Sequence, residues 1–306
     1  MSPKRSRVSP ATVFFALLSL VLAVALYLKT RPGREPVQPP VFPPRVSASP
    51  RPRVRLTPRP PVSPSPRPFS PASPRPQVLL PEQAESLPRI AILIDDLGND
   101  SAAVERISRW RTPFSAAVLP ALAGSAPAAR QLEAAGVEVL LHLPMEPKGF
   151  PSVRPGPGVL LLAQTDDELG RILEADLDTV PGAVGVNNHM GSAATADPRV
   201  MRVIMKVLAR RRLFFVDSRT TDATVAEVEA RAAGVRAVSR RVFLDDVATE
   251  PAVERSLAEL ASRARREGSA VAIGHPHAAT LAVLERELPK LQREGVKLVR
   301  VGDLVR

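Results

Sequence analysis

Short apolar runs alternate with amphipathic stretches from residue 89 to the end of the sequence, and this alternation restricts the fold more than any other feature. The runs resemble buried strands and lie at 89–94, 114–119, 137–142, 183–188, 213–217, 237–244, 270–274 and 297–301. The amphipathic stretches have helical periodicity and lie at 101–110, 125–135, 166–179, 198–211, 224–233, 250–267 and 278–294. Strands that alternate with helices form parallel sheets. The sequence therefore predicts an α/β domain over 89–306, with its parallel sheet either open or rolled into a complete or incomplete barrel.

The first 31 residues have the features of a membrane anchor. An uncharged run, 11–28, has three basic residues before it and two after it. Its length is at the lower limit for a spanning helix, and the leading basic residues favour a cytoplasmic N-terminus. Residues 23–25, Ala-Val-Ala, alternatively fit a signal-peptidase site. Because the apolar run continues to Leu28, we favour an uncleaved single pass through a bacterial inner membrane, with the remaining chain in the periplasm.

Proline dominates residues 32–88, which contain 19 of the 34 prolines of the chain. Proline fixes φ and removes a backbone donor, so neither helix nor sheet is expected in this segment. Many of these prolines adjoin arginine or serine. We therefore predict a disordered Pro/Arg-rich linker that holds the domain away from the membrane.

The net charge of +11 belongs to the tail and not to the predicted domain. Residues 1–89 hold 14 Lys and Arg against three acidic residues, whereas residues 90–306 hold 28 of each sign. A neutral domain lacks the basic surface that nucleic-acid binding requires, so no nucleic-acid partner is expected. The chain has no cysteine, which excludes disulfides, thiolate metal sites and cysteine nucleophiles.

Residue types that bind metals or transfer protons follow the apolar runs directly. Asp95 and Asp96 end the first run, and adjacent strand residues point to opposite faces, so one carboxylate can bind an ion while the other transfers protons. His142 and Glu146 end another run, and His189 ends a third. Zinc accepts both nitrogen and oxygen ligands. Since the carboxyl ends of parallel strands meet at one rim, this pattern predicts an enzyme.

Further polar residues at the strand ends are candidates for substrate contacts or for support of the metal ligands. Asn188 offers an amide beside the third run. Asp217 and Arg219 form either an ion pair at the rim or part of the catalytic apparatus. His275 and His277 flank a proline, so one ring can face the pocket while the other contacts a supporting carboxylate.

These motifs, in their order and spacing, resemble the divergent polysaccharide deacetylase family, a branch of the NodB-like carbohydrate deacetylases. The matching stretches are Ala-Ile-Leu-Ile-Asp-Asp-Leu-Gly, Leu-His-Leu-Pro-Met-Glu-Pro, Asn-Asn-His-Met-Gly-Ser, Phe-Val-Asp-Ser-Arg-Thr, Val-Phe-Leu-Asp-Asp and Ile-Gly-His-Pro-His. The resemblance covers 89–306 and implies an irregular or incomplete (β/α) barrel of about seven to eight parallel strands. It also implies a metal-dependent amide hydrolase with a divalent cofactor, zinc being the first choice.

Among the implied metal ligands are Asp96 and His142. The superfamily's usual second motif is His-x-x-x-His, and here a glutamate stands in place of its second histidine. The third ligand is therefore either Glu146, from the same motif, or His189, from another strand.

The resemblance implies that Asp95 is the general base and His275 the general acid. The expected reaction is removal of an acyl group from an amino sugar or a similar small amide. One alternative is a catalytically inactive envelope protein that keeps the fold in order to bind a ligand or partner. Another is a different metal hydrolase, such as a phosphoesterase, although the neutral domain and the lack of a clear phosphate loop count against it. Tyr27 and Trp110 are the only tyrosine and tryptophan, so an extended aromatic sugar-binding groove is not expected.

Overall fold

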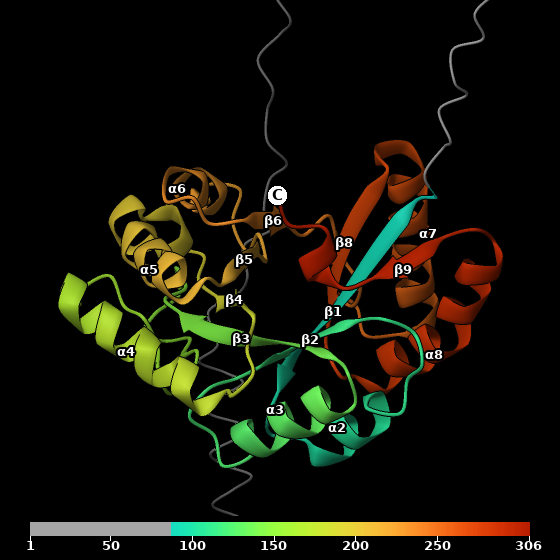
Figure 1. Ribbon diagram of the computed structural model, residues 1–306, viewed down its shortest axis with the longest axis horizontal. Coiled ribbons are helices and arrows are strands. Elements are labelled where there is room, and N and C mark those ends of the chain that lie inside the picture. The colour runs from blue at the N-terminus through green and yellow to red at the C-terminus, as the bar shows by residue number, and fades with distance from the viewer. Residues whose placement is uncertain (1–86) are drawn as a thin grey trace, which may run out of the picture. The chain divides into compact units, whose positions relative to one another are not determined.

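The computed structural model of the chain describes residues 87–306, and Figure 1 shows them as a curved sheet with helices on its outer side. The predicted anchor and all but the last two residues of the predicted linker lie outside the described residues. Within 87–306, no helix combines the length and the apolar character needed to cross a bilayer.

Residues 87–306 form nine strands in one sheet, and every pairing between neighbouring strands is parallel. The strands are β1 (Arg89–Leu97), β2 (Ser115–Val118), β3 (Glu138–Met145), β4 (Gly185–Met190), β5 (Phe214–Asp217), β6 (Ala237–Ser239), β7 (Val242–Phe243), β8 (Ser269–Gly274) and β9 (Lys297–Val299).

Helices follow most of the strands, as the amphipathic stretches predict. They are α2 (Ser101–Ile107), α3 (Ser125–Ala134), α4 (Asp166–Thr179), α5 (Pro198–Arg211), α6 (Ala226–Ala232), α7 (Glu250–Glu267) and α8 (Ala278–Arg293), with short 3-10 turns at η1 (Ala194–Ala196) and η2 (Val301–Asp303). Capping groups set several of the starts. Thr165 and Glu168 form a reciprocal capping box at α4, and the Asp197 side chain accepts two backbone N–H groups at α5, so exposed amides at these helix ends are satisfied.

The sheet is rolled into an incomplete barrel. Its strand order is β6-β5-β4-β3-β2-β1-β8-β7, with β9 beside the first three residues of β1. The two edge strands, β6 and β7, are separated in the chain by only Arg240 and Arg241, so the sheet must curl until its edges approach each other. The Arg240 amide donates to the Asp217 carbonyl at 2.9 Å, and the Arg241 amide donates to the Val271 carbonyl at 2.8 Å. The chain therefore crosses from one edge to the other between these two arginines, and the predicted incomplete (β/α) barrel is confirmed.

The prediction of one strand over 237–244 was wrong. The structure divides this segment into β6, which pairs with β5, and β7, which pairs with β8 at the opposite edge of the sheet. The local sequence does not show where a strand changes its pairing partner. The partner is set by the curvature of the whole sheet.

Alternation along the strands separates an outer core from an inner one. In β1, Ile90, Ile92 and Ile94 belong to the large core between sheet and helices, whereas Ala91 and Leu93 belong to a smaller core inside the barrel. The other buried members of this inner core are Ala117, Leu140, Phe214, Val216, Val271, Ile273, Val299, Val301 and Leu304. Because side chains alternate with a period of two, the inner row of each strand determines which residue reaches the interior at its carboxyl end.

One acidic group in the outer layer lacks a counter-charge. Asp176 of α4 is 3% exposed, and its Oδ2 has no hydrogen-bond partner among the described residues. Its carboxylate lies so close to Gly158 that a Cβ at that glycine would come within 2.2 Å of Oδ1. Burial raises the pKa of Asp176 to about 7. The folded chain therefore binds a proton at Asp176 more tightly than the unfolded chain does.

We expect the variant Asp176→Asn to be more stable than the wild type at alkaline pH. The stability associated with a raised carboxyl pKa is present below about pH 4 and is lost as the pH rises toward 7. Each pH unit between the unfolded and folded pKa values contributes about 1.36 kcal/mol. The gain in the free energy of unfolding should therefore reach at most about 4 kcal/mol at pH 8. This gain should shrink toward pH 4. Urea unfolding of metal-free protein at pH 5 and pH 8 would measure it. Asp178→Asn, an exposed change on the same helix, is the matched control. An equal gain at both pH values would contradict the prediction.

Candidate metal centre and active site

Polar side chains occupy the inner row of the barrel where the apolar residues end. On β1, Asp95 follows Ala91 and Leu93 in the inward alternation, and on β3 His142 follows Leu140. Both side chains are 2% exposed. The inward-facing row of side chains on these strands thus changes from apolar to titratable residues at the carboxyl end of the sheet.

A bulge in β1 brings Asp96 to the same cluster. The β1–β2 register shifts between Ile94 and Leu97, and Asp96 has a left-handed φ of 58°. A bulge adds one residue to a strand and changes the direction of its side chains. Asp96 would otherwise point outward with Ile94, but its Oδ1 lies near two histidines of the interior. A strained φ at a non-glycine residue persists where the surrounding structure imposes it, frequently at functional sites.

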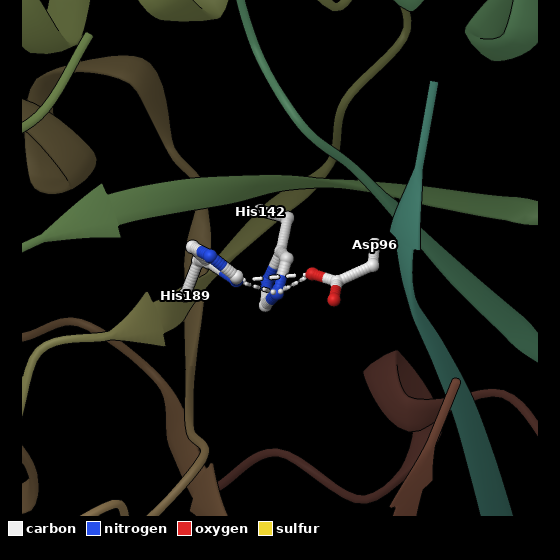
Figure 2. Close-up of side chains that lie close together, drawn as sticks. All are labelled: Asp96, His142 and His189. Atoms are coloured by element: carbon white, nitrogen blue, oxygen red, sulfur yellow. Dashed lines mark hydrogen bonds and ion pairs between the residues drawn. The ribbon is translucent and has the colours of Figure 1, made fainter. Parts of the chain in front are cut away.

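Asp96, His142 and His189 converge on one point from three different strands, as Figure 2 shows. Asp96 Oδ1 lies 3.1 Å from His142 Nε2 and 3.0 Å from His189 Nδ1, and the two ring nitrogens are 3.1 Å apart. Despite these short distances, Asp96 Oδ1 is buried without a hydrogen-bond partner among the described residues. The three atoms approach one another, but the carboxylate oxygen is not aligned for a hydrogen bond with either ring.

This triangle fits a divalent transition metal. Ligands about 2.0–2.2 Å from a tetrahedral ion lie about 3.3–3.5 Å apart, close to the separations of the three atoms. Two imidazoles and one carboxylate suit zinc and also other divalent transition metals. A buried carboxylate oxygen with no hydrogen-bond partner is also a group for which an ion would supply the missing interaction. The donor set and its geometry are therefore consistent with the predicted divalent cofactor.

Asn187 orients the histidine at the centre of the cluster. Its Nδ2 donates to both oxygens of Asp95, at 2.9 and 3.0 Å, which directs its Oδ1 toward His142 Nδ1 at 2.9 Å. An amide oxygen can only accept, so His142 carries its proton on Nδ1 and directs the Nε2 lone pair at the triangle. Outer hydrogen bonds of this kind fix the tautomer of a metal-binding histidine.

The two adjacent aspartates have opposite electrostatic environments. Burial raises the pKa of Asp95, although His142 and His275 oppose this shift. Burial would also raise the pKa of Asp96, but the polar contacts and charges of His142 and His189 outweigh it and hold that pKa well below its usual range. One carboxylate is therefore suited to carry a proton and the other to remain an anion.

His275 approaches the second carboxylate oxygen of Asp96, Oδ2, whereas His142 and His189 approach Oδ1. Its Nδ1 lies 3.0 Å from Asp245 Oδ1, and its Nε2 lies 3.7 Å from Asp96 Oδ2. Asp245 Oδ2 accepts hydrogen bonds from the His275 amide and from the Thr280 hydroxyl. Burial alone would lower the pKa of His275, but the hydrogen bond and charge of Asp245 raise it. Asp245, His275 and His277 also lie close enough to share an ion. Both Asp245 oxygens already accept hydrogen bonds, however. We therefore interpret His275 as a proton donor that Asp245 orients.

The remaining predicted site residues lie around the cluster without joining it. Glu146 accepts from the Leu162 amide at 2.7 Å, so its carboxylate contacts the following loop while His189 completes the triangle. Asn188 is the outward neighbour of Asn187 and links the Met190 carbonyl to the Ser218 amide.

The predicted pair Asp217 and Arg219 meets through the backbone. The Asp217 carboxylate accepts from the Arg219 amide and the Thr224 hydroxyl, whereas the Arg219 guanidinium lies 3.5 Å from Asp222. Asp217 therefore orders the turn after β5. His277 is exposed at the start of α8, with its ring 5.8 Å from that of His275.

Sequence reasoning missed the roles of Asn187 and Asp245. A signal existed for Asn187, because alternation from Val186, an outer-core residue, places the first asparagine of the motif inward. Alternation from Phe243 likewise places Asp245 inward.

Comparison with known proteins supports the family suggested by the motifs. A family model of divergent polysaccharide deacetylases matches residues 92–305. An uncharacterized protein of Haemophilus influenzae is 38% identical over 221 residues, which are 71% of this chain and 77% of that protein. The uncharacterized Escherichia coli protein YibQ is 36% identical over 217 residues, which are 71% of this chain and 67% of YibQ.

A solved structure shares the fold. The crystal structure of the uncharacterized protein ATU2773 from Agrobacterium tumefaciens has a TM-score of 0.68 at 24% identity, covering 74% of this chain and 92% of that one. The family match spans most of this chain, and the two bacterial relatives align with a similar share of it. The chain therefore belongs to the divergent polysaccharide deacetylase family.

Proposed function

We propose that this protein is a metal-dependent hydrolase that removes an acyl group from an amino sugar or a similar small amide. The observation that carries the proposal is the triangle of Asp96, His142 and His189 between two proton-transfer groups, Asp95 and His275. Deacetylation needs this combination, because water must lose a proton and the departing amine must gain one.

Asp96, His142 and His189 would hold the ion, with zinc as the first choice. When bound, such an ion polarises the acyl carbonyl and lowers the pKa of water. Asn187 keeps the His142 lone pair directed at the site. His142 Nε2 lies 3.5 Å from Asp95 Oδ2 and 3.1 Å from Asp96 Oδ1, which supports a site in which both carboxylates act beside the ion.

Asp95 would accept the proton of the attacking water, and its raised pKa brings it closer to the range useful for a general base. His275 would deliver a proton from Nε2 to the leaving nitrogen, while Asp245 holds Nδ1 and stabilises the imidazolium. The C–N bond breaks, the acyl carbon gains the water oxygen as a carboxylate, and the nitrogen leaves as an amine. Asp95 and His275 would thus move one proton each.

We further propose that the enzyme acts in the periplasm on a membrane tether. The support lies in the sequence, in the uncharged run 11–28 with its leading basic residues. The proline-rich segment 32–88 would act as a semi-rigid spacer between membrane and domain. The absence of cysteine is compatible with an oxidising compartment.

The full-length protein, loaded in turn with zinc, manganese and cobalt, should release acetate from at least one member of a panel of N-acetylated amino sugars and oligosaccharides. A chelator should abolish the release, and readdition of the metal should restore it. The activity should sediment with the membranes of cells that express the chain. Stoichiometric metal binding without acetate release would instead favour an inactive binding protein of the same fold.

A further inference from the structure

Arg240 lies at the crossing between the sheet edges, and its side chain is held in a fixed orientation. Its Nε donates to the Ser218 carbonyl at 2.7 Å, and its Nη2 donates to the Arg219 carbonyl at 3.0 Å. A guanidinium has five N–H groups in one plane. Two are used by these carbonyls, and Nη1 has no hydrogen-bond partner among residues 87–306, so its N–H groups remain to bind a ligand.

Two chains of contacts place this guanidinium beside the proposed active site. Its Cζ lies 4.8 Å from the centre of the Phe243 ring, and that ring lies 5.3 Å from the His275 ring. On the other side, the Ser218 hydroxyl lies 3.3 Å from Asn187 Nδ2, the group that holds Asp95. Arg240 therefore belongs to the same rim as the general acid and the general base.

The positive charge of Arg240 has no ionic partner within the described chain. No carboxylate of residues 87–306 lies within 4.0 Å of its guanidinium, although the side chain is half-buried. Burial lowers its pKa, and the more distant charges of Asp246, Asp217 and Asp95 only oppose this shift. Arginine nevertheless remains charged at neutral pH. By contrast, Arg219, in the turn after β5, has its guanidinium 3.5 Å from the Asp222 carboxylate.

We propose that Arg240 selects substrates that carry a carboxylate close to the scissile amide, so that the preferred substrates are acidic N-acyl amino sugars. This inference rests on the proposed function and names its substrate class. A carboxylate matches the free edge of a guanidinium through two parallel N–H···O bonds. Because two backbone carbonyls already orient the guanidinium, little side-chain entropy is lost when the ligand binds.

The same contacts also allow Arg240 a purely structural role, in which it joins the turn after β5 to the crossing. The two roles differ in what a substitution changes. Loss of a structural contact would weaken the binding of every ligand, whether charged or neutral. Loss of a carboxylate contact would affect only the acid, so the test compares ligands that differ in that charge alone.

The experiment measures the dissociation constants of metal-loaded full-length protein for a disaccharide that contains N-acetylmuramic acid and for its methyl ester. The wild type should bind the free acid about 10- to 100-fold more tightly than the ester, as expected for a charge-assisted hydrogen bond. Arg240→Gln should lose this preference while its affinity for the ester stays within about twofold. Arg240→Lys should keep part of the preference, because it retains charge without the planar fork.

Arg241→Gln is the matched control, since Arg241 also lies at the crossing but is exposed, 3.9 Å from Glu267, and it should leave the preference unchanged. Equal binding of acid and ester by the wild type would overturn the proposal, as would no binding of the acid. A preference that survives in Arg240→Gln would overturn it too. A preference that depends on Arg240 without any acetate release would uphold this inference and count against the proposed deacetylase activity, so the two failures are distinguishable.

Discussion

Replacing His142 by alanine should abolish metal retention, and Asp96→Asn and His189→Ala should do the same. His142→Ala and His189→Ala each remove one of three atoms that lie within 3.1 Å of one another, and Asp96→Asn replaces the third, an anionic carboxylate oxygen, with a neutral amide. Loss of a residue that supports a metal ligand lowers metal affinity by roughly 10- to 100-fold. Loss of a direct ligand should lower it by more than that. Asn187→Ala is such a supporting change and should fall within that lower range. Metal content by mass spectrometry and affinity by competition with a chelator would measure both effects.

Glu146→Ala and His277→Ala are the matched controls for the ligand assignment. Glu146 contacts the Leu162 amide instead of the triangle, and His277 is an exposed histidine beside the site. Both variants should keep their metal. Loss of metal from Glu146→Ala with retention in His189→Ala would reverse the assignment of the third ligand. Retention in both Asp96→Asn and His142→Ala would mean that the cluster is structural.

Metal affinity should also fall as the pH is lowered, because histidine ligands must lose their protons to bind. Burial alone would lower the pKa of His142, but the charges of Asp95 and Asp96 raise it above its usual value. Proton competition should therefore begin above about pH 6.5, the ordinary value for histidine. The same chelator competition, repeated from pH 8 to pH 5, would show it.

Replacing Asp95 by asparagine or His275 by alanine should leave the metal bound and remove turnover. Neither residue supplies an atom of the triangle, and proton transfer by a positioned group contributes about 10²- to 10⁴-fold to the rate. The loss should appear in kcat, since both groups act on protons that move in the transition state. Asp245→Asn should give a smaller loss, because it removes the charge that orients His275 and leaves the ring in place. Steady-state kinetics on metal-loaded variants would separate these effects.

Two outcomes would contradict the assignment of proton transfer to Asp95 and His275. If Asp95→Asn lost its metal, Asp95 would be a ligand or its contact with Asn187 would be indispensable to the site. If His275→Ala kept full activity on the substrate of the wild type, the leaving amine would receive its proton from elsewhere. His277→Ala again serves as the control, with kcat expected to remain unchanged.

Periodicity was sufficient to predict the helices and most of the strands. The predicted ranges of α4, α5 and α7 agree with their observed bounds, because amphipathic spacing, capping residues and proline at helix starts are all local. The crossing at Arg240 depends instead on where distant strand edges meet, and no local pattern contains that information. The repeated elements predict a parallel sheet and the family resemblance implies the barrel, but neither gives the position at which the barrel opens.

The site was likewise predictable only where it depends on local sequence and on the shared rim of parallel strands. Asp96 and His142 could be expected to meet because both follow buried strands, and parallel strands end at one rim. The choice between Glu146 and His189 could not be made, because it depends on a loop contact for one and on strand pairing for the other. The bulge at Asp96 was also beyond sequence reasoning, since adjacent aspartates would ordinarily point to opposite faces.

The order of strands around the barrel divides the proposed site residues between two groups of strands, or arcs, that meet at β1. The residues of the triangle come from β1, β3 and β4 on one side, whereas Asp245 and His275 follow β7 and β8 on the other. The open seam between β6 and β7 lies outside the triangle's arc. A variant that lost His275, the proposed general acid, would therefore keep the three residues of the cation site and a packed barrel. On the proposed function, a single substitution at His275 would therefore convert the hydrolase into a binding protein without any change of fold.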